Sequence, residues 1–130
     1  MVFNFSSDVV SGTASVTTGV GGVLGSPVFA GNTMTVNLTD VADVQKITVT
    51  LTNVTGSDSQ VLPSAGVSMN VLVGDTNADK TVNNMDVRAT RGQVGIAVTA
   101  LNFREDLDAN GVINKADVTV VKNAAGHSLP

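Results

Sequence analysis

The chain has no cysteine, no tryptophan and no tyrosine, and its 130 residues include one histidine and four phenylalanines. Without cysteine it can form neither disulfide bridges nor a thiol nucleophile. Charged residues make up only 14% of the chain, and its seven lysines and arginines form no run, which argues against nucleic-acid binding. No stretch is long and apolar enough to predict a membrane-spanning helix. Small domains of this composition need a stabilising element other than a disulfide, such as a bound metal ion.

The motifs of common enzyme classes are missing as well. The single histidine, His127, lies in a Gly-His-Ser-Leu-Pro segment near the C-terminus, where we expect it to be exposed and not catalytic. The serines lack a Gly-x-Ser-x-Gly elbow. The glycine-rich segment 19–25 lacks the lysine and the following helix of a phosphate-binding loop. We therefore expect a protein that is not an enzyme.

What the chain does contain is a duplicated pattern of oxygen-bearing side chains. Residues 75–86 and 106–117 are twelve-residue segments, 31 positions apart, with such side chains at positions 1, 3, 5, 9 and 12. This spacing lets a loop wrap around Ca²⁺, a hard cation that takes six to eight oxygen ligands. Each loop also gathers three carboxylates, whose mutual repulsion favours a bound cation. The alternative is a pair of polar, Asx-rich turns without metal.

The expected ligands follow from the loop positions. Side-chain oxygens are expected from positions 1, 3, 5 and 12, a backbone carbonyl from position 7, and a contact through water from position 9. The sequence thus predicts two Ca²⁺ ions, the first held by Asp75, Asn77, Asp79, Thr81, Asn83 and Asp86, and the second by Asp106, Asp108, Asn110, Val112, Asn114 and Asp117. Position 6 needs a positive φ angle, which suits Gly111 better than Lys80. The first site is therefore expected to be the weaker one.

The repeat continues beyond the loops. A helix is expected after each loop, at about 85–93 and about 115–125, and a third, short helix at 100–104. Residues 74–127, about two-fifths of the chain, resemble a type I dockerin domain, whose pattern is a doubled Asp-x-Asn-x-Asp-Gly-x-Val-Asn-x-x-Asp loop with a following helix. The resemblance implies a small three-helix domain that holds two calcium ions. It also implies a non-catalytic module that docks onto cohesin domains of bacterial scaffold proteins.

The same resemblance implies which residues contact a partner. Dockerins carry a pair of small hydroxyl-bearing residues at loop positions 10 and 11, and this pair recognises the cohesin. They also carry a basic residue in each following helix. The hydroxyl pair is replaced here, and the basic residue is kept. The expected partner-binding residues are Asn84, Met85, Arg91, Lys115, Ala116 and Lys122.

The first 73 residues show a different pattern, in which threonine or serine alternates with aliphatic residues. Aliphatic residues on one face and threonine on the other favour an antiparallel, immunoglobulin-like β-sandwich. The predicted fold class is therefore α+β in two modules, a β-sandwich domain at 1–73 and a small three-helix, dockerin-like calcium-binding domain at 74–130. Strands are expected at about 2–5, 14–18, 27–30, 33–38, 47–52 and 67–73.

Six strands are fewer than the seven of an immunoglobulin-like sandwich, so the sequence predicts an open sheet edge. A neighbouring copy can fill such an edge with its own N-terminal strand, in which Phe3 and Phe5 would point inward. Strand exchange of this kind runs head to tail and builds a filament. The alternative is that the N-terminal strand pairs within its own domain.

Three functional hypotheses follow. The favoured one is an extracellular structural protein, stabilised by calcium, whose partners are copies of itself. The second is a docking module for a cohesin-like partner, and the third is the non-catalytic part of a secreted polysaccharide-degrading enzyme. The dockerin resemblance implies a location outside a bacterial cell or at its surface. Two bound calcium ions would bring the formal charge from −4 to zero, which permits close association.

Overall fold

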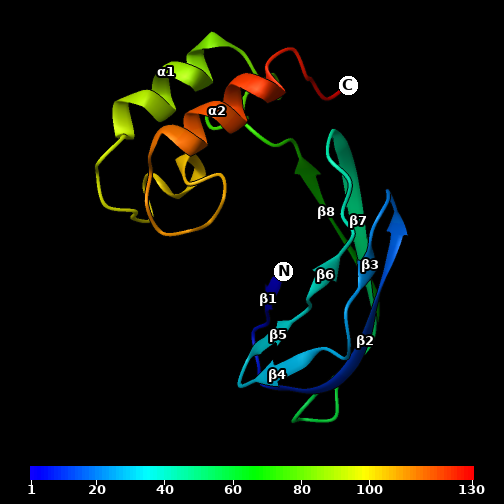
Figure 1. Ribbon diagram of the computed structural model, residues 1–130. Coiled ribbons are helices and arrows are strands. Elements are labelled where there is room, and N and C mark those ends of the chain that lie inside the picture. The colour runs from blue at the N-terminus through cyan, green and yellow to red at the C-terminus, as the bar shows by residue number, and fades with distance from the viewer. The chain divides into compact units, whose positions relative to one another are not determined.

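The computed structural model describes all residues, 1–130, and divides into two compact units, Met1–Asn70 (unit 1) and Val71–Pro130 (unit 2). The chain forms eight strands and three helical segments. Figure 1 labels the strands and the helices α1 and α2. In chain order these are β1 (Val2–Asn4), β2 (Val9–Thr18), β3 (Gly22–Val23), β4 (Val28–Ala30), β5 (Thr33–Thr35), β6 (Leu38–Thr39), β7 (Gln45–Gly56), β8 (Val61–Val71), α1 (Asn84–Gln93), the 3₁₀ turn η1 (Phe103–Glu105) and α2 (Lys115–Ala124).

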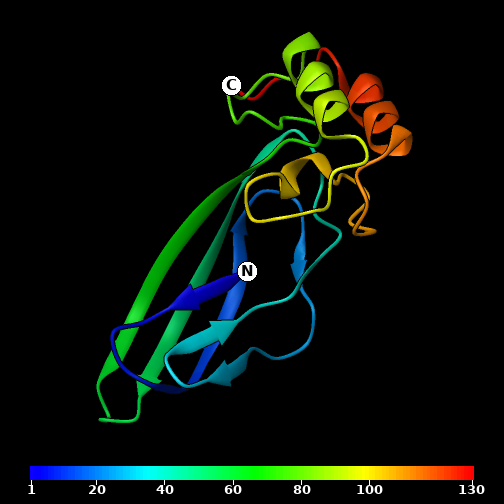
Figure 2. The same ribbon diagram turned by 90° about the vertical axis from the view of Figure 1, so that its left-hand side faces the viewer.

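Unit 1 consists of antiparallel strands in three small sheets. One sheet has the order β1-β5-β4 and another the order β2-β7-β8, and Figure 2 shows these two facing each other. β3 and β6 form a separate two-stranded sheet. β2 pairs with β7 from Val9 opposite Gly56 to Thr18 opposite Thr48, with register shifts at three places. The strands β1 and β8 therefore each form an edge of a sheet.

The core of unit 1 is apolar and comes mainly from alternate residues of these strands. Along β7, Ile47, Val49 and Leu51 are buried, while the threonines between them are partly exposed. The alternation predicted for this segment is therefore confirmed. The core cluster contains Phe3, Val9, Met34, Val36, Val49, Leu51 and Val54.

The predicted fold class is wrong. The chain is mostly β, with 38% of its residues in strands and 18% in helical segments. Unit 1 has three small sheets and not the predicted immunoglobulin-like sandwich. Asp40 and Val44 have φ angles of 52° and 56°, and such turns interrupt extended backbone between β6 and β7. The short strands β3 and β6, with two residues each, cannot extend a larger sheet.

Unit 2 is not a three-helix domain either, because only η1 forms where the third helix was expected. The expected segment 100–104 has five residues, too few for an isolated helix. Leu101 is 97% exposed, so no apolar contact stabilises a helix there. Instead, the side-chain oxygen of Asn102 accepts a hydrogen bond from the N–H of Thr99 at 2.6 Å, and its amide donates to the side chain of Gln93 at 3.1 Å. No helix of the chain has the length and apolar character that a membrane crossing requires.

Met34 tests the packing of unit 1, because its side chain is fully buried. Replacing it with alanine removes apolar contacts and leaves a cavity, so we expect Met34→Ala to lower the free energy of unfolding by about 2–5 kcal/mol. The control is Val28→Ala in the neighbouring strand, where the side chain is 57% exposed and the expected change is about 0.5 kcal/mol. Urea unfolding followed by circular dichroism measures both. Equal effects of the two substitutions would contradict the described core.

Candidate metal centres

The two predicted loops lead into their helices through the same cap. The N-cap residues of α1 and α2 are Asn83 and Asn114, and each side-chain oxygen accepts a hydrogen bond from the N–H two residues later, at 2.7 Å. Asp86 and Asp117 complete a capping box by accepting from the N-cap N–H at 2.8 and 2.9 Å. Loop position 12 is therefore also the third residue of the helix. This fixes where each loop ends.

The same two aspartates bind the start of their own loops. Asp86 Oδ1 accepts hydrogen bonds from the N–H groups of loop positions 2 and 3 at 3.0 and 3.3 Å, and Asp117 Oδ1 accepts from the same positions at 2.8 and 3.3 Å. Both side chains are fully buried. Burial alone raises the pKa of Asp117, but hydrogen bonds from the N–H groups of Asn114, Asp108 and Leu107 outweigh it and lower that pKa below its usual 3.8. The carboxylate of Asp117 is thus held in its charged form.

Position 1 organises the middle of each loop in the same way. The carboxylate of Asp75 accepts hydrogen bonds from the N–H groups of positions 5 and 6 at 3.1 and 3.0 Å. The carboxylate of Asp106 accepts from the equivalent groups at 3.1 and 3.0 Å. These bonds curl each loop around its first side chain. The loops therefore share one conformation although their sequences differ.

Positions 3 and 5 hold one carboxylate and one amide in each loop, in opposite order. In the first loop, Asn77 Nδ2 donates to Asp79 Oδ2 at 2.9 Å. In the second loop, Asn110 Nδ2 donates to Asp108 Oδ2, also at 2.9 Å. Each loop therefore presents three carboxylates and one amide at positions 1, 3, 5 and 12.

The carboxylates of the second loop lie close enough to share one cation. Oxygen atoms of Asp106, Asp108 and Asp117 are all within 4.8 Å of one another. Calcium–oxygen distances of about 2.3–2.6 Å place ligands on opposite sides of an ion about 5 Å apart. The cluster therefore has the dimensions of a calcium site.

The remaining predicted ligands have additional or different contacts. The position-9 residues, Asn83 and Asn114, direct their side-chain oxygens to the helix N-termini as N-caps. At position 7, the carbonyl of Val112 accepts a hydrogen bond from Asn114 Nδ2 at 3.2 Å. The exposed Thr81 takes the same position in the first loop and forms a β-bridge with Ser128. The structure thus brings the carboxylates of positions 1, 3 and 12 together in the second loop and uses position 9 as a helix cap in both loops.

The position-8 residues, Val82 and Ile113, are buried, and their backbones pair with segments that follow the helices. Gly126, after α2, donates its N–H to the carbonyl of Val82 at 2.9 Å, and Gly95, after α1, donates to the carbonyl of Ile113 at 3.0 Å. Each loop is therefore tied to the segment that follows the helix of the other repeat. The spacing of 31 residues between the two repeats holds for these contacts as well.

The residues expected to bind a partner through unit 2 lie on its surface. Asn84, Met85, Arg91, Lys115, Ala116 and Lys122 are all exposed, Met85 by 64%. Of these, Arg91, Lys115 and Lys122 line one groove of about 410 Å³ together with Val94, Val118 and Thr119. Sequence reasoning missed the last three residues. The spacing of the α2 members, at positions i, i+3, i+4 and i+7, is a signal that places them on one helix face.

The two phenylalanines expected to be donated to a neighbour have places within unit 1. β1 pairs with β5, with Phe3 opposite Met34, and Phe3 is 9% exposed within the core cluster. The N-terminal amine of Met1 donates to the carbonyl of Val36 at 2.6 Å. Phe5 is partly buried against the same core. Strand exchange through β1 would have to break all of these contacts.

Comparisons with known proteins add no assignment to this geometry. No protein family matches the chain, and no curated protein or solved structure matches it. What the loops do is therefore inferred from their own residues and contacts.

The two loops differ at position 6, where Lys80 has a φ angle of 71° and Gly111 one of 85°. A residue with a Cβ atom is strained in this region by about 1–2 kcal/mol. We therefore expect Lys80→Gly to stabilise unit 2 and Gly111→Ala to destabilise it, each by about 1 kcal/mol. A Cβ at Gly111 meets no atom within 4 Å, so backbone strain alone is tested. Urea unfolding of the helical signal without calcium measures both, and changes of the same sign would refute the explanation.

The lowered pKa of Asp117 predicts an acid-sensitive capping box. Because the folded state binds the proton of Asp117 less tightly than the unfolded chain, its contribution to stability is complete above the usual pKa of 3.8 and is lost as the pH falls through the lower folded value. We expect calcium-free protein to be more stable than its Asp117→Asn variant at neutral pH and to lose this advantage on acidification below pH 3.8. Thermal unfolding of both proteins across pH checks this. A constant difference across the acid range would contradict it.

Proposed function

We propose that this chain is a non-catalytic extracellular protein, that two calcium ions stabilise its helical unit, and that it serves a structural role in assembly. The observation that carries the proposal is the matched geometry of the two loops. In both loops, 31 residues apart, the carboxylates at positions 1 and 12 accept hydrogen bonds from the same backbone positions, and each loop carries three carboxylates and one amide. A polar turn without a ligand would not need three carboxylates at these positions twice.

The residues present fit calcium. The first loop offers side-chain oxygens of Asp75, Asn77, Asp79 and Asp86, and the second those of Asp106, Asp108, Asn110 and Asp117. Backbone carbonyls at Thr81 and Val112 and a water at position 9 would bring each ion to six oxygen ligands or more. No sulfur or imidazole ligand is among them, which favours a hard cation over zinc or copper.

Bound calcium would stabilise unit 2 in two ways. It would offset the repulsion among three carboxylates in each loop, and it would connect the start of each loop to the first turn of the following helix. The apolar cluster between the helices is small and contains Val82, Val87, Val118, Val121 and Ala124. A unit with so little core and no disulfide gains much from a bound metal.

A docking module for a cohesin-like partner is the second candidate. The observation that favours it is Met85, which is 64% exposed in the first turn of α1, beside the exposed Asn84. An exposed methionine is a flexible apolar contact that suits protein–protein recognition. Calcium-dependent binding to a purified cohesin, abolished by Met85→Glu, would favour this candidate over self-assembly.

Calcium binding is tested by titration calorimetry on the whole chain. We expect two calcium ions per chain, and one ion per chain for each of the variants Asp79→Asn and Asp108→Asn. These substitutions keep the shape of the side chain and remove one charged ligand from one loop. Calcium at 100 times its dissociation constant should raise the free energy of unfolding by about 2.7 kcal/mol per site.

The matched control is Asp40→Asn, which removes an exposed carboxylate of unit 1 outside both loops. It should leave the stoichiometry at two. Absence of binding to the wild-type chain at millimolar calcium would refute the proposed function.

A further inference from the structure

The two units differ in formal charge, and bound calcium would change the formal charge of unit 2 from negative to positive. Unit 1 contains four aspartates and a single lysine, Lys46, which gives −3. Unit 2 contains seven acidic and six basic residues, which gives −1. Two bound Ca²⁺ ions would change unit 2 from −1 to +3 and leave unit 1 unchanged. Units that repel each other between copies without calcium would then attract each other with it.

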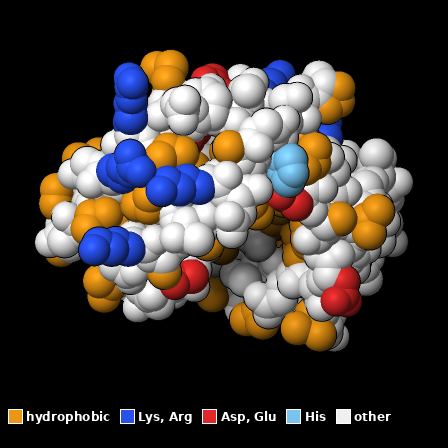
Figure 3. All heavy atoms as spheres, turned by 45° about the horizontal axis from the view of Figure 1, so that its top comes forward, with side chains coloured by type: hydrophobic (Ala, Val, Ile, Leu, Met, Phe, Trp, Pro, Cys, Tyr) orange, Lys and Arg blue, Asp and Glu red, His pale blue; other side chains and the backbone are white.

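The basic groove of unit 2 is a candidate surface for this attraction. It has a volume of about 410 Å³, and we call it the helix groove. Arg91, Lys115 and Lys122 line it, while Val118 and Val94 supply apolar surface. No acidic residue lines it. Figure 3 shows lysine and arginine side chains gathered on one face with hydrophobic side chains between them.

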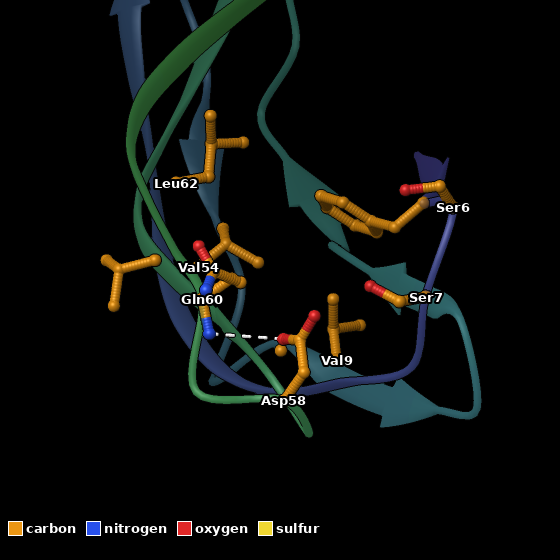
Figure 4. Close-up of a pocket in the computed structure, with 10 residues that line it drawn as sticks. Ser6, Ser7, Val9, Val54, Asp58, Gln60 and Leu62 are labelled. Atoms are coloured by element: carbon orange, nitrogen blue, oxygen red, sulfur yellow. Dashed lines mark hydrogen bonds between the residues drawn. The ribbon is translucent and has the colours of Figure 1, made fainter.

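Unit 1 carries a groove of the opposite kind, which we call the hairpin groove. It has a volume of about 300 Å³ and lies between the segment after β1 and the β7–β8 hairpin. In Figure 4, Val9, Val54 and Leu62 line it, and Asp58 lies beside them in the turn. The carboxylate of Asp58 accepts a hydrogen bond only from the N–H of Gln60, at 3.1 Å.

A second carboxylate lies at the same end of unit 1. The carbonyl of Asp8 accepts a hydrogen bond from the N–H of Ser57 at 2.9 Å, next to Asp58. Both aspartates are exposed. Lys46, the only basic side chain of the unit, lies near the opposite end of β7 from Gly56, roughly 30 Å away at the rise of a β-strand. The hairpin groove therefore combines apolar side chains with Ser6, Ser7 and Gln60, one carboxylate lines it, and no lysine or arginine does.

We propose that the helix groove of one copy docks onto the hairpin groove of a second copy once calcium occupies the loops. The occupant is a second copy because this chain itself carries both complementary surfaces, basic around apolar on unit 2 and acidic around apolar on unit 1. The calcium dependence rests on the proposed function. The dependence on calcium follows from the position of Lys115, directly after Asn114 in the second loop. Without an ion, the carboxylates of this loop would offset the positive charge of Lys115, and a bound ion would neutralise these carboxylates.

The two surfaces are different, so the contact is heterologous. Each docked copy still offers one free groove of each kind, so association continues as an open chain unless its rotation closes a ring. Exposed charge pairs are individually weak and screened by salt, so the association should be reversible and should weaken at high ionic strength.

Sedimentation velocity on the whole chain tests the docking. We expect monomers in excess chelator, larger species in millimolar calcium, and a return toward monomers when 0.5 M NaCl is added at constant calcium. Calorimetry on the same samples reports calcium binding separately. A wild-type chain that binds two calcium ions and stays monomeric would overturn the docking and leave the calcium function standing. A chain that binds no calcium would refute the proposed function itself.

Charge-reversed variants locate the contact. Arg91→Glu with Lys122→Glu makes the helix groove acidic, and Asp8→Lys with Asp58→Lys makes the rim of the hairpin groove basic. In calcium, each variant alone should stay monomeric, since its two grooves then carry like charges. An equimolar mixture should associate again, because each groove then meets its complement on the other variant.

The control is Lys46→Glu, which reverses one exposed charge outside both grooves and should associate like the wild type. Restored association in the mixture also shows that both variants are folded. Association of either variant alone at the wild-type level, or a mixture of calcium-binding variants that stays monomeric, would overturn the assigned surfaces.

Discussion

The helical unit depends on one carboxylate in each repeat that serves two parts of the chain at once. Asp86 and Asp117 cap their helices and also accept hydrogen bonds from the first residues of their loops. Each loop is therefore closed by hydrogen bonds from its backbone N–H groups to the carboxylate at position 12. In the second loop, the carboxylates of Asp106 and Asp108 lie within 4.8 Å of the carboxylate of Asp117, where their charges repel. The proposed ions would act on this repulsion, and the hydrogen bonds already provide the geometry that they need.

Local features of unit 2 could be predicted from the sequence because neighbouring residues determine them. The helices expected at 85–93 and 115–125 are observed at 84–93 and 115–124, since the asparagine caps and position-12 aspartates lie directly before or within them. Positive φ at position 6 follows from the same local geometry. The third helix was wrong because Asn102 forms hydrogen bonds with residues three to nine positions away, which stabilise a turn. The cap role of position 9 was also missed, although asparagine before a helix is a common signal.

Long-range pairing is what the sequence could not provide. The alternation along β7 predicted its buried face, but not that β3 and β6 would form a sheet of their own or that β1 would pair with β5. The pairing of each loop with the segment after the other helix is equally non-local. The two grooves combine residues from separate elements, so only the structure shows that three cations share one surface and that Asp8 and Asp58 lie at one end of unit 1. The proposed docking would use the basic groove of unit 2 and the acidic end of unit 1, which lie on the same chain.

If both loops hold calcium, a crystal structure grown in millimolar calcium, with anomalous scattering to locate the ions, will show it. We expect two anomalous peaks, one in each loop. Each should be surrounded by six or more oxygen atoms at about 2.3–2.6 Å, including those of Asp75 and Asp86 in one loop and Asp106 and Asp117 in the other. Two ordered loops without ions, or calcium bound elsewhere on the chain, would contradict it.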